Sequence, residues 1–282
     1  MNSLRLLTSG ARRLALSALR PRPFLNSVRG FRKRSPCDVC LYEPDKRPCF
    51  DIRKVLVERG NQCHAKMIRS FLYTHYWPRE PSVVGLWMAL DCPYLETLTD
   101  KYSNSGDRLL AFEKVDRTEE VKLVGVSVAN KICPWVVDEL EEWAHYTASK
   151  PERHRMYFTA HCLRSPNLFK KYHVDYIYEV EILGTASEVA GQGVGALLLR
   201  TALEHALDLR HPIVQVITTS HYSEKICEKC GMKREWMMRY TDFVDDAGQR
   251  VFFPRRPHHN VCVYVKTLAD LSKPPCKSQP NL

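Results

Sequence analysis

Hydrophobic and polar positions alternate over several short stretches of the chain, whereas other stretches repeat apolar residues at spacings of three and four. Short alternating or continuous apolar runs predict strands, and the longer period predicts helices. Strands are therefore expected at 50–57, 108–115, 121–132, 174–184, 213–218 and 261–268. Helices are expected over 62–76 and, interrupted at Pro93, over 81–102.

The order of these elements predicts the fold class. Helices do not separate every strand from the next, so we expect one α/β layer whose sheet contains both parallel and antiparallel neighbours. At 282 residues and 44% hydrophobic composition, the chain can bury a core in one large domain or two small ones. It contains no run of about 18 apolar residues, so no membrane-spanning helix is predicted. No internal repeat is visible.

A glycine-rich segment leads directly into a helical pattern. In "EVAGQGVGALLLRTALEHAL", Gly191, Gly193 and Gly195 alternate with other residues before an apolar helical stripe. A helix N-terminus presents unpaired amides and the positive end of the dipole, and glycine lacks the Cβ that would block an approaching anion. This pattern predicts a phosphate or pyrophosphate site, and the alternative is a glycine-rich turn without a ligand.

Two common phosphate ligands fit this segment poorly. The Gly-Lys-Ser/Thr ending of a nucleotide-hydrolysing P-loop is absent. The dinucleotide fingerprint G-x-G-x-x-G/A is satisfied over 191–196, but that fold needs an acidic residue near the end of the next strand to hold the ribose. Here the strand ends in Thr218, Thr219 and Ser220, which argues against a nicotinamide cofactor.

The first 36 residues differ in composition from the rest. They hold nine Arg and Lys residues, no acidic residue precedes Asp38, and apolar residues recur at helical spacing. This is typical of a mitochondrial transit peptide, so we expect a location in the matrix; a basic tail on a cytoplasmic protein is the alternative. Removing these nine charges from the net +10 leaves +1, which argues against a nucleic-acid-binding surface.

Eleven cysteines raise the question of a zinc site. The pairs Cys37/Cys40 and Cys227/Cys230 have the spacing of a four-thiolate site. Cys227 and Cys230, however, share one helical face before Gly231, a candidate helix cap, which favours buried thiols. We therefore expect no metal, and Cys37 and Cys40 are left without a function.

The stretches "VEILGTASEVAGQGVGALLL" and "VITTSHYSEKICEKCGMKREWMMRYTDF" resemble the GCN5-related N-acetyltransferases, particularly the insect-type arylalkylamine branch. The family pattern Arg/Gln-x-x-Gly-x-Gly/Ala is matched at Gly193 and Gly195, with Ala190 at its first position. The resemblance covers 50–266 and implies one N-acetyltransferase domain there, followed by a polar tail over 267–282. It implies a mixed, mostly antiparallel sheet, splayed at the strand "YEVEILGT" and flanked by helices.

The resemblance also implies acetyl-coenzyme A (acetyl-CoA) as cosubstrate. Its pantetheine arm would lie along Leu183, Gly184 and Thr185. Its pyrophosphate would meet the backbone amides of Gln192, Gly193, Val194, Gly195 and Ala196.

Acetyl transfer to an amine needs a base for the amine, donors for the oxyanion and an acid for the thiolate. By resemblance, Glu80 in "HYWPREPSVVGL" is the base, acting through water. In "TSHYS", Ser223 is the hydroxyl that serves the thiolate, with Tyr222 as a second candidate. Thr219 stands where a serine is common. From the residues alone, a solvated loop carboxylate is the commoner situation for a residue such as Glu80. Ser220 is predicted to be a helix N-cap, and Ser223 could merely lie in the first helical turn.

The resemblance favours an enzyme that acetylates a small primary amine, such as an arylalkylamine. One alternative is a mitochondrial acyltransferase of the glycine type, which the leader segment favours. Another is a degenerate acyl-CoA-binding protein, suggested by Ala190 and Thr219. We expect a monomer or weak oligomer without nucleic-acid or membrane partners.

Overall fold

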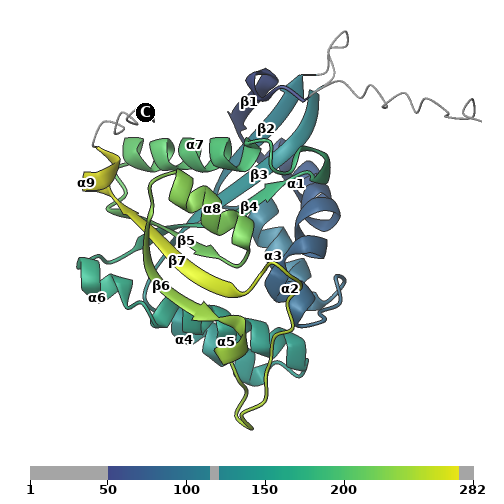
Figure 1. The fold of residues 1–282 in the computed structure, drawn as a ribbon, viewed down its shortest axis with the longest axis vertical. Coiled ribbons are helices and arrows are strands. Elements are labelled where there is room, and N and C mark those ends of the chain that lie inside the picture. Colours follow the sequence, from purple (N-terminus) through teal and green to yellow (C-terminus); the bar gives the residue numbers. More distant parts are fainter. Residues whose placement is uncertain (1–49, 115–120, 273–282) are drawn as a thin grey trace, which may run out of the picture. The chain divides into compact units, whose positions relative to one another are not determined.

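The computed structural model describes residues 50–114 and 121–272. The strands formed by these residues join in one seven-stranded sheet, in the order β1-β2-β3-β4-β5-β7-β6 (Figure 1). Only β4 and β5 are parallel, which confirms the mixed, mostly antiparallel sheet. The strands are β1 (Val55–Arg59), β2 (Asp107–Lys114), β3 (Val121–Ile132), β4 (Ile177–Thr185), β5 (Ile213–Thr218), β6 (Lys233–Arg239) and β7 (Asn260–Thr267).

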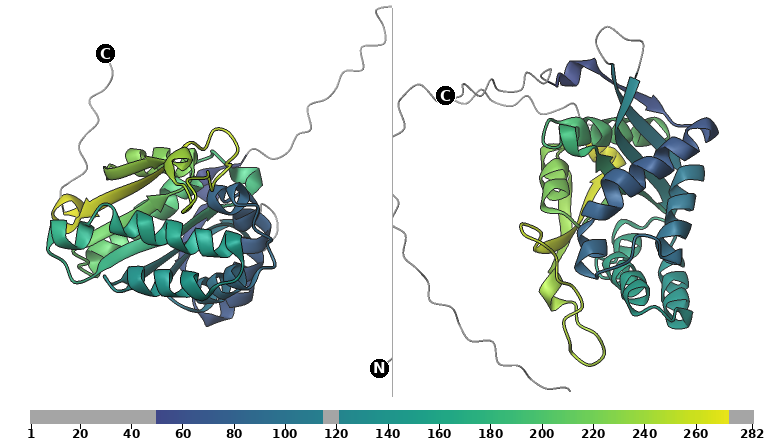
Figure 2. Two further views of the ribbon diagram at one scale, coloured as in Figure 1. Left: turned by 90° about the horizontal axis from the view of Figure 1, so that it is seen from below. Right: turned by 90° about the vertical axis from the view of Figure 1, so that its right-hand side faces the viewer.

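Helices cover both faces of the sheet, with α7 and α8 on one face and α1, α3, α4 and α5 on the other (Figure 2). Close packing of α7 on β3 requires a glycine there, because a Cβ at Gly125 would lie 2.8 Å from Leu198. The helices are α1 (Ala65–Phe71), α2 (Pro81–Gly85), α3 (Pro93–Asn104), α4 (Val136–Tyr146), α5 (Lys150–Arg164), α6 (Leu168–Tyr172), α7 (Val194–Asp208), α8 (His221–Lys229) and α9 (Leu268–Leu271).

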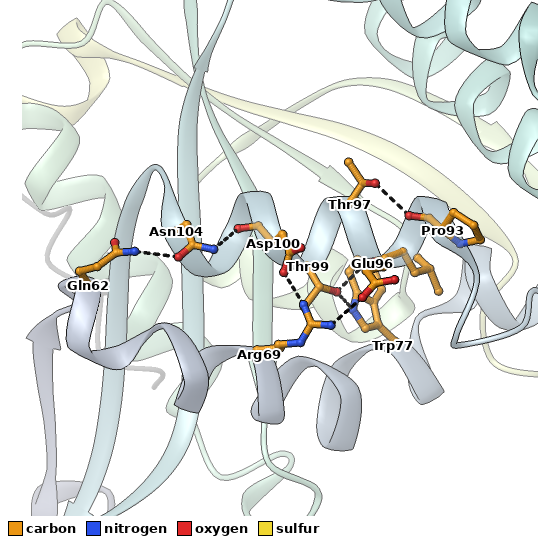
Figure 3. Close-up of polar contacts among 10 residues, drawn as sticks. Gln62, Arg69, Trp77, Pro93, Glu96, Thr97, Thr99, Asp100 and Asn104 are labelled. Atoms are coloured by element: carbon orange, nitrogen blue, oxygen red, sulfur yellow. Dashed lines mark hydrogen bonds and ion pairs between the residues drawn. The ribbon is translucent and has the colours of Figure 1, made fainter.

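The helical segment that begins with α1 is held against α3 by polar contacts (Figure 3). The buried Trp77 donates its indole N–H to Thr99 Oγ1 at 2.8 Å. Arg69 forms ion pairs with Glu96, at 3.1 Å, and with Asp100. Because Trp77 is almost fully buried, with 2% of its surface exposed, it is a core residue that anchors the chain just before Glu80.

The parallel strands β4 and β5 are paired at one end only. Their cross-strand pairs are Tyr178 with Val214 and Glu179 with Gln215. Beyond Glu179, within the described part of the chain, β4 pairs only with β3 and β5 only with β7. The two strands therefore diverge along β4, the strand at which the sheet was expected to splay. Beyond Glu179, the backbone N–H and C=O groups on the edge of β4 that faces β5 pair with no strand.

An irregularity in β4 accompanies this divergence. The register with β3 shifts between Val128 and Ala129, so Glu181 has no opposite residue on β3. Such a bulge bends a strand and redirects its side chains. Glu181 faces α3, where it pairs with Lys101 at 2.9 Å and accepts a hydrogen bond from the Tyr102 hydroxyl at 2.8 Å.

The ends of the domain bear on three sequence expectations. The predicted leader over 1–36 lies outside the described residues, as does the end of the tail from 273 onward. The boundary expected at 266 falls inside β7, and the following α9 packs Leu271 against the core. None of the helices in the described ranges is both long and apolar enough to cross a membrane.

Candidate active site

Prolines on both sides fix the backbone around Glu80. Pro78 lies in a short helical turn, Trp77–Arg79, and Pro81 is the first residue of α2. A residue before proline avoids the helical conformation, and Glu80 is indeed extended, with φ −67° and ψ 115°. Glu80 thus becomes the N-cap of α2, and its side chain turns inward, with 5% of the residue's surface exposed.

Both carboxylate oxygens of Glu80 accept hydrogen bonds. The hydroxyl and the backbone N–H of Ser82 donate to Oε1, the N–H at 3.3 Å. The hydroxyl of Thr219 donates to Oε2 at 2.9 Å. Glu80 is therefore not a solvated loop carboxylate, because it is buried and held in one orientation by three donors.

Thr219 follows directly after β5 and is clamped in turn by a tyrosine. The Tyr240 hydroxyl donates to the Thr219 carbonyl oxygen at 2.8 Å. Burial, and next the nearby charge of Glu80, raise the pKa of Tyr240 well above its usual value. The phenol thus stays protonated and keeps this hydrogen bond over the physiological pH range.

Arg79 contacts the other diverging strand, at the end of β4. Its Nη2 donates to the carbonyl oxygen of Thr185, the last residue of β4, and its Nε donates to the His75 carbonyl at 2.7 Å. Glu80 accepts a hydrogen bond from Thr219, the residue after β5, so the 75–80 segment bridges the diverging ends of β4 and β5.

Buried and partly buried phenols and carboxylates lie near the 75–80 segment. Burial is the main cause that raises the pKa values of Tyr76, Tyr94 and Tyr102. At the last β4–β5 pair, burial and then the neighbouring Glu181 raise the pKa of Glu179 to about 8. Its contact with Gln215 Nε2 is 3.3 Å long.

The glycine-rich segment leads into α7 as predicted. Gly193 is the N-cap at φ +95°, a left-handed conformation that suits glycine, and no side chain caps the helix. The first helical bond runs from Leu197 N–H to Gly193 O at 3.0 Å. Within the described residues, no hydrogen bond engages the backbone N–H groups of Gly193, Val194, Gly195 and Ala196. The Gln192 N–H is different, since it donates to Val189 O at 3.2 Å.

Gly195 has a packing function as well. A Cβ at this position would lie 2.8 Å from Ile226 Cδ1 in α8. The absence of a side chain therefore lets α7 and α8 approach each other, independently of any ligand.

Ser220 and Ser223 form a capping box at the start of α8. Ser220 Oγ accepts from the Ser223 N–H at 3.0 Å, and Ser223 Oγ accepts from the Ser220 N–H at 3.3 Å. The Ser223 hydroxyl also donates to the Ser220 carbonyl oxygen at 2.8 Å. This confirms Ser220 as the N-cap. Ser223 has no hydrogen bond to Glu80 or Thr219 among the described residues, and Tyr222 is largely exposed.

Comparisons with known proteins identify the fold. No protein-family model matches the sequence. A mosquito arylalkylamine N-acetyltransferase-like 5b is similar in structure, with a TM-score of 0.68 and 22% identity over 76% of this chain and 99% of that chain. An agmatine N-acetyltransferase gives 0.69 and 22% over the same shares. A Drosophila melanogaster polyamine N-acetyltransferase gives 0.65 and 22%, again over 76% and 99%.

The chain has the GCN5-related N-acetyltransferase fold. Within this fold, the predicted acetyl-CoA strand is the strand that diverges, and Leu183, Gly184 and Thr185 are its last three residues. The fold also brings Glu80 and Thr219 into hydrogen-bonding contact across 139 positions of sequence.

The second cysteine pair consists of buried thiols, as predicted. Cys227 is fully buried and Cys230 is 9% exposed, and burial raises the pKa of both thiols. No group of three or more His, Cys, Asp or Glu side chains suited to a metal occurs in the described ranges. Cys37 and Cys40 lie outside them.

Sequence reasoning missed two residues of this site, namely Arg79 and Tyr240. It also missed Arg155 on α5, whose charge interacts with that of Glu80. Arg155 had a detectable signal, because it falls on the inner stripe of α5, three residues after Glu152 and four before Thr159. A charged residue on such a stripe is unusual. Arg79 and Tyr240 had no such signal, since their contacts depend on distant strand ends.

Proposed function

We propose that the protein is an N-acetyltransferase that moves the acetyl group of acetyl-CoA to the nitrogen of a small primary amine. One observation carries this proposal. The carboxylate of Glu80 is buried and accepts three hydrogen bonds, and it lies on a segment that bridges the ends of the diverging strands β4 and β5. Where β4 and β5 diverge, the unpaired backbone edge of β4 can bind an extended ligand, and the carboxylate beside it can accept a proton from an amine.

The free groups around the gap suit acetyl-CoA. The unpaired edge of β4 offers backbone donors and acceptors to the amides of a pantetheine arm, as an added strand would use them. The unbonded amides at the start of α7 suit a pyrophosphate, because they point along the positive end of a 15-residue helix. Both features support the predicted contacts at Leu183–Thr185 and at 193–196. They do not extend to Gln192, whose backbone N–H and side-chain amide donate to Val189 O and Glu188 O.

In the proposed reaction Glu80 accepts a proton from the ammonium group through a water molecule. The free amine nitrogen then attacks the acetyl carbonyl carbon and forms the new C–N bond. The C–S bond breaks and coenzyme A leaves as a thiolate. The former amine nitrogen gives up its second proton and the thiolate takes up a proton, so the products are a neutral amide and a free thiol. Thr219 supports the base directly, since its hydroxyl holds Oε2 of Glu80.

Ser223 is the proposed proton donor to the thiolate. Its hydroxyl now donates to the Ser220 carbonyl, so protonating a thiolate requires this bond to be exchanged. We therefore expect a small contribution from Ser223. Tyr222 is the second candidate, and its exposed ring lies edge-on to His258 at 5.7 Å.

The names of the similar structures support an amine as acceptor. They are described as arylalkylamine, agmatine and polyamine N-acetyltransferases. At 22% identity the likeness itself concerns the fold, so the residues above carry the proposed chemistry and the amine is proposed only as a class.

We also propose that the enzyme works in the mitochondrial matrix, with a cytoplasmic location as the alternative. The support is the composition of 1–36, which is basic, free of acidic residues and periodic in its apolar positions.

A thiol-release assay tests the proposed activity. Purified protein and acetyl-CoA should release coenzyme A at a rate that rises with added amine, and mass spectrometry should find the N-acetylated amine. Tight acetyl-CoA binding without amine-dependent release would instead indicate a degenerate acyl-CoA-binding protein.

A further inference from the structure

The geometry of α5 directs one charged side chain toward the site. Glu152 Oε2 accepts the backbone N–H of Tyr94 at 3.0 Å, and the Phe158 ring stacks on Tyr240 with centroids 5.7 Å apart. Arg155 is three residues from each of these contacts, and residues at this spacing share one face of a helix. Arg155 therefore lies between Tyr94 and Tyr240, on the side of α5 that faces Glu80.

The guanidinium of Arg155 lacks a carboxylate partner. Nη1 donates to the Thr159 hydroxyl, which in turn donates to the Arg155 carbonyl at 2.9 Å. Nε is buried without a hydrogen-bond partner, and no ion pair joins Arg155 to any carboxylate in the described ranges. Thr159 thus holds the side chain in place, while Nε has no acceptor among the described residues.

The other charged groups nearby are already accounted for. Glu181 is paired with Lys101. Glu179, with its pKa raised to about 8 by burial and by Glu181, is mostly protonated at neutral pH. Burial lowers the pKa of Arg155, but the nearby Tyr94 and Glu80 more than offset this. The Arg79 guanidinium is held at the end of β4 by the His75 and Thr185 carbonyl oxygens. The carboxylate of Glu80 and the guanidinium of Arg155 remain, and no ion pair joins them.

We propose that the amine substrate also carries a carboxylate, and that Arg155 binds this carboxylate while Glu80 faces the ammonium group. The inference rests on the proposed function and narrows its substrate class to small amino acids. A guanidinium matches a carboxylate in geometry as well as charge, because its planar N–H groups can donate two parallel bonds. The same charge repels a second ammonium or guanidinium group, so polyamines and agmatine should be poor substrates.

Matched substrate pairs test this inference. Each pair differs only by a carboxylate: glycine with methylamine, β-alanine with ethylamine, and tyrosine with tyramine. In at least one pair, wild-type kcat/KM should be higher for the amino acid. Arg155→Gln should lower kcat/KM for that amino acid by about 10- to 100-fold, the scale of a hydrogen bond to a charged group, and spare the plain amine.

Two variants serve as controls. Arg153→Gln removes a positive charge two positions away, on another side of α5, and should change both members of a pair by less than about twofold. Arg155→Lys keeps the positive charge but loses the planar guanidinium, so it should lower kcat/KM for the amino acid less than Arg155→Gln does. It also preserves the test if the glutamine variant does not fold. An equal loss for amino acid and plain amine would overturn the inference, because it would indicate a general electrostatic role.

Calorimetry separates this inference from the proposed function. Glycine, β-alanine and tyrosine, each with its matched plain amine, are titrated into wild-type protein and Arg155→Gln, both saturated with coenzyme A. Binding of at least one of these amino acids that depends on Arg155 would sustain the inference even if no amine is acetylated. Acetylation of amines with no preference for a carboxylate would sustain the proposed function and overturn the inference. Absence of Arg155-dependent binding for all three amino acids would overturn the inference as well.

Discussion

Glu80 can be replaced by an isosteric residue without removing the groups that hold it. Glu80→Gln deletes the base while keeping its size, so we predict a turnover lower by about 10²- to 10⁴-fold, the usual contribution of a general base. Raising the pH should restore part of the rate, because more of the amine then arrives deprotonated. The measurements are kcat across pH and the calorimetric affinity for coenzyme A, which should not change. A variant with full activity would remove Glu80 from the mechanism.

The two serines of the α8 capping box allow a matched comparison. Ser220→Ala removes the N-cap and should cost about 1 kcal/mol of folding free energy. It also removes the 2.9 Å contact between the two hydroxyls but keeps the hydroxyl of Ser223, the proposed proton donor. Ser223→Ala should destabilise the box and also lower kcat, by much less than Glu80→Gln. Thermal unfolding and kcat are measured for both variants. Equal kcat values in the two would assign Ser223 to capping alone.

For the helix α7, the decisive change is at its N-cap. Gly193→Asp places a carboxylate beside the unbonded amides, so coenzyme A affinity should fall by more than about 2 kcal/mol through repulsion and competition for those amides. Gly193→Asn has nearly the same shape and the same left-handed strain, and it serves as the uncharged control. Gly195 is less suitable, because a side chain there would meet Ile226. Equal calorimetric affinities of the two variants would show that no anion docks at this helix.

At the point where β4 and β5 diverge, the buried Glu179 predicts how the stability of the protein depends on pH. Glu179 has its folded-state pKa raised to about 8 by burial and by Glu181, from an ordinary value of 4.5. Between these values the native state holds a proton that the unfolded state has released, so stability falls as pH rises, by about 1.4 kcal/mol per pH unit. Glu179→Gln should remove this slope and raise Tm at pH 8 relative to wild type. If Tm differs between wild type and Glu179→Gln by the same amount at pH 5 and at pH 8, the raised pKa of Glu179 is contradicted.

At the scale of the whole molecule, the basic leader over residues 1–36 predicts import into mitochondria. A fluorescent protein fused behind residues 1–36 should enter mitochondria, and replacing Arg12, Arg13 and Arg20 with Glu should prevent entry, because import selects a basic amphipathic helix. Microscopy and fractionation measure the outcome. A diffuse cytosolic signal from the unmodified leader would favour the basic-tail alternative.

Much of the architecture was predictable because periodicity is a local property. The runs at 121–132 and 213–218 coincide with β3 and β5, and the helix after the glycine loop begins at Val194 as α7. The helices α4 to α6 and the strand β6 were not predicted. The inner stripe of α5 includes Arg155, and β6 is a largely exposed edge strand of mixed polarity, so neither shows a clean hydrophobic period.

The candidate site was only partly predictable. Glu80 and Thr219 were named through resemblance, but their contact across 139 residues depends on how β5 ends beside α2. The bridge made by Arg79 and the clamp made by Tyr240 are likewise tertiary. Local patterns carry no information on such pairs, because they report which face of an element is buried and not what it meets.

The most direct test of the account is a single-turnover reaction with excess enzyme and acetyl-CoA labelled with ¹³C at the carbonyl. β-Alanine or tyramine is the acceptor, and NMR follows the label. In the wild type the label should move from the thioester to an amide within one enzyme turnover, and Glu80→Gln should slow the transfer while retaining bound acetyl-CoA. Label that stays in the thioester, or appears as free acetate at the same rate with and without amine, would contradict an N-acetyltransferase.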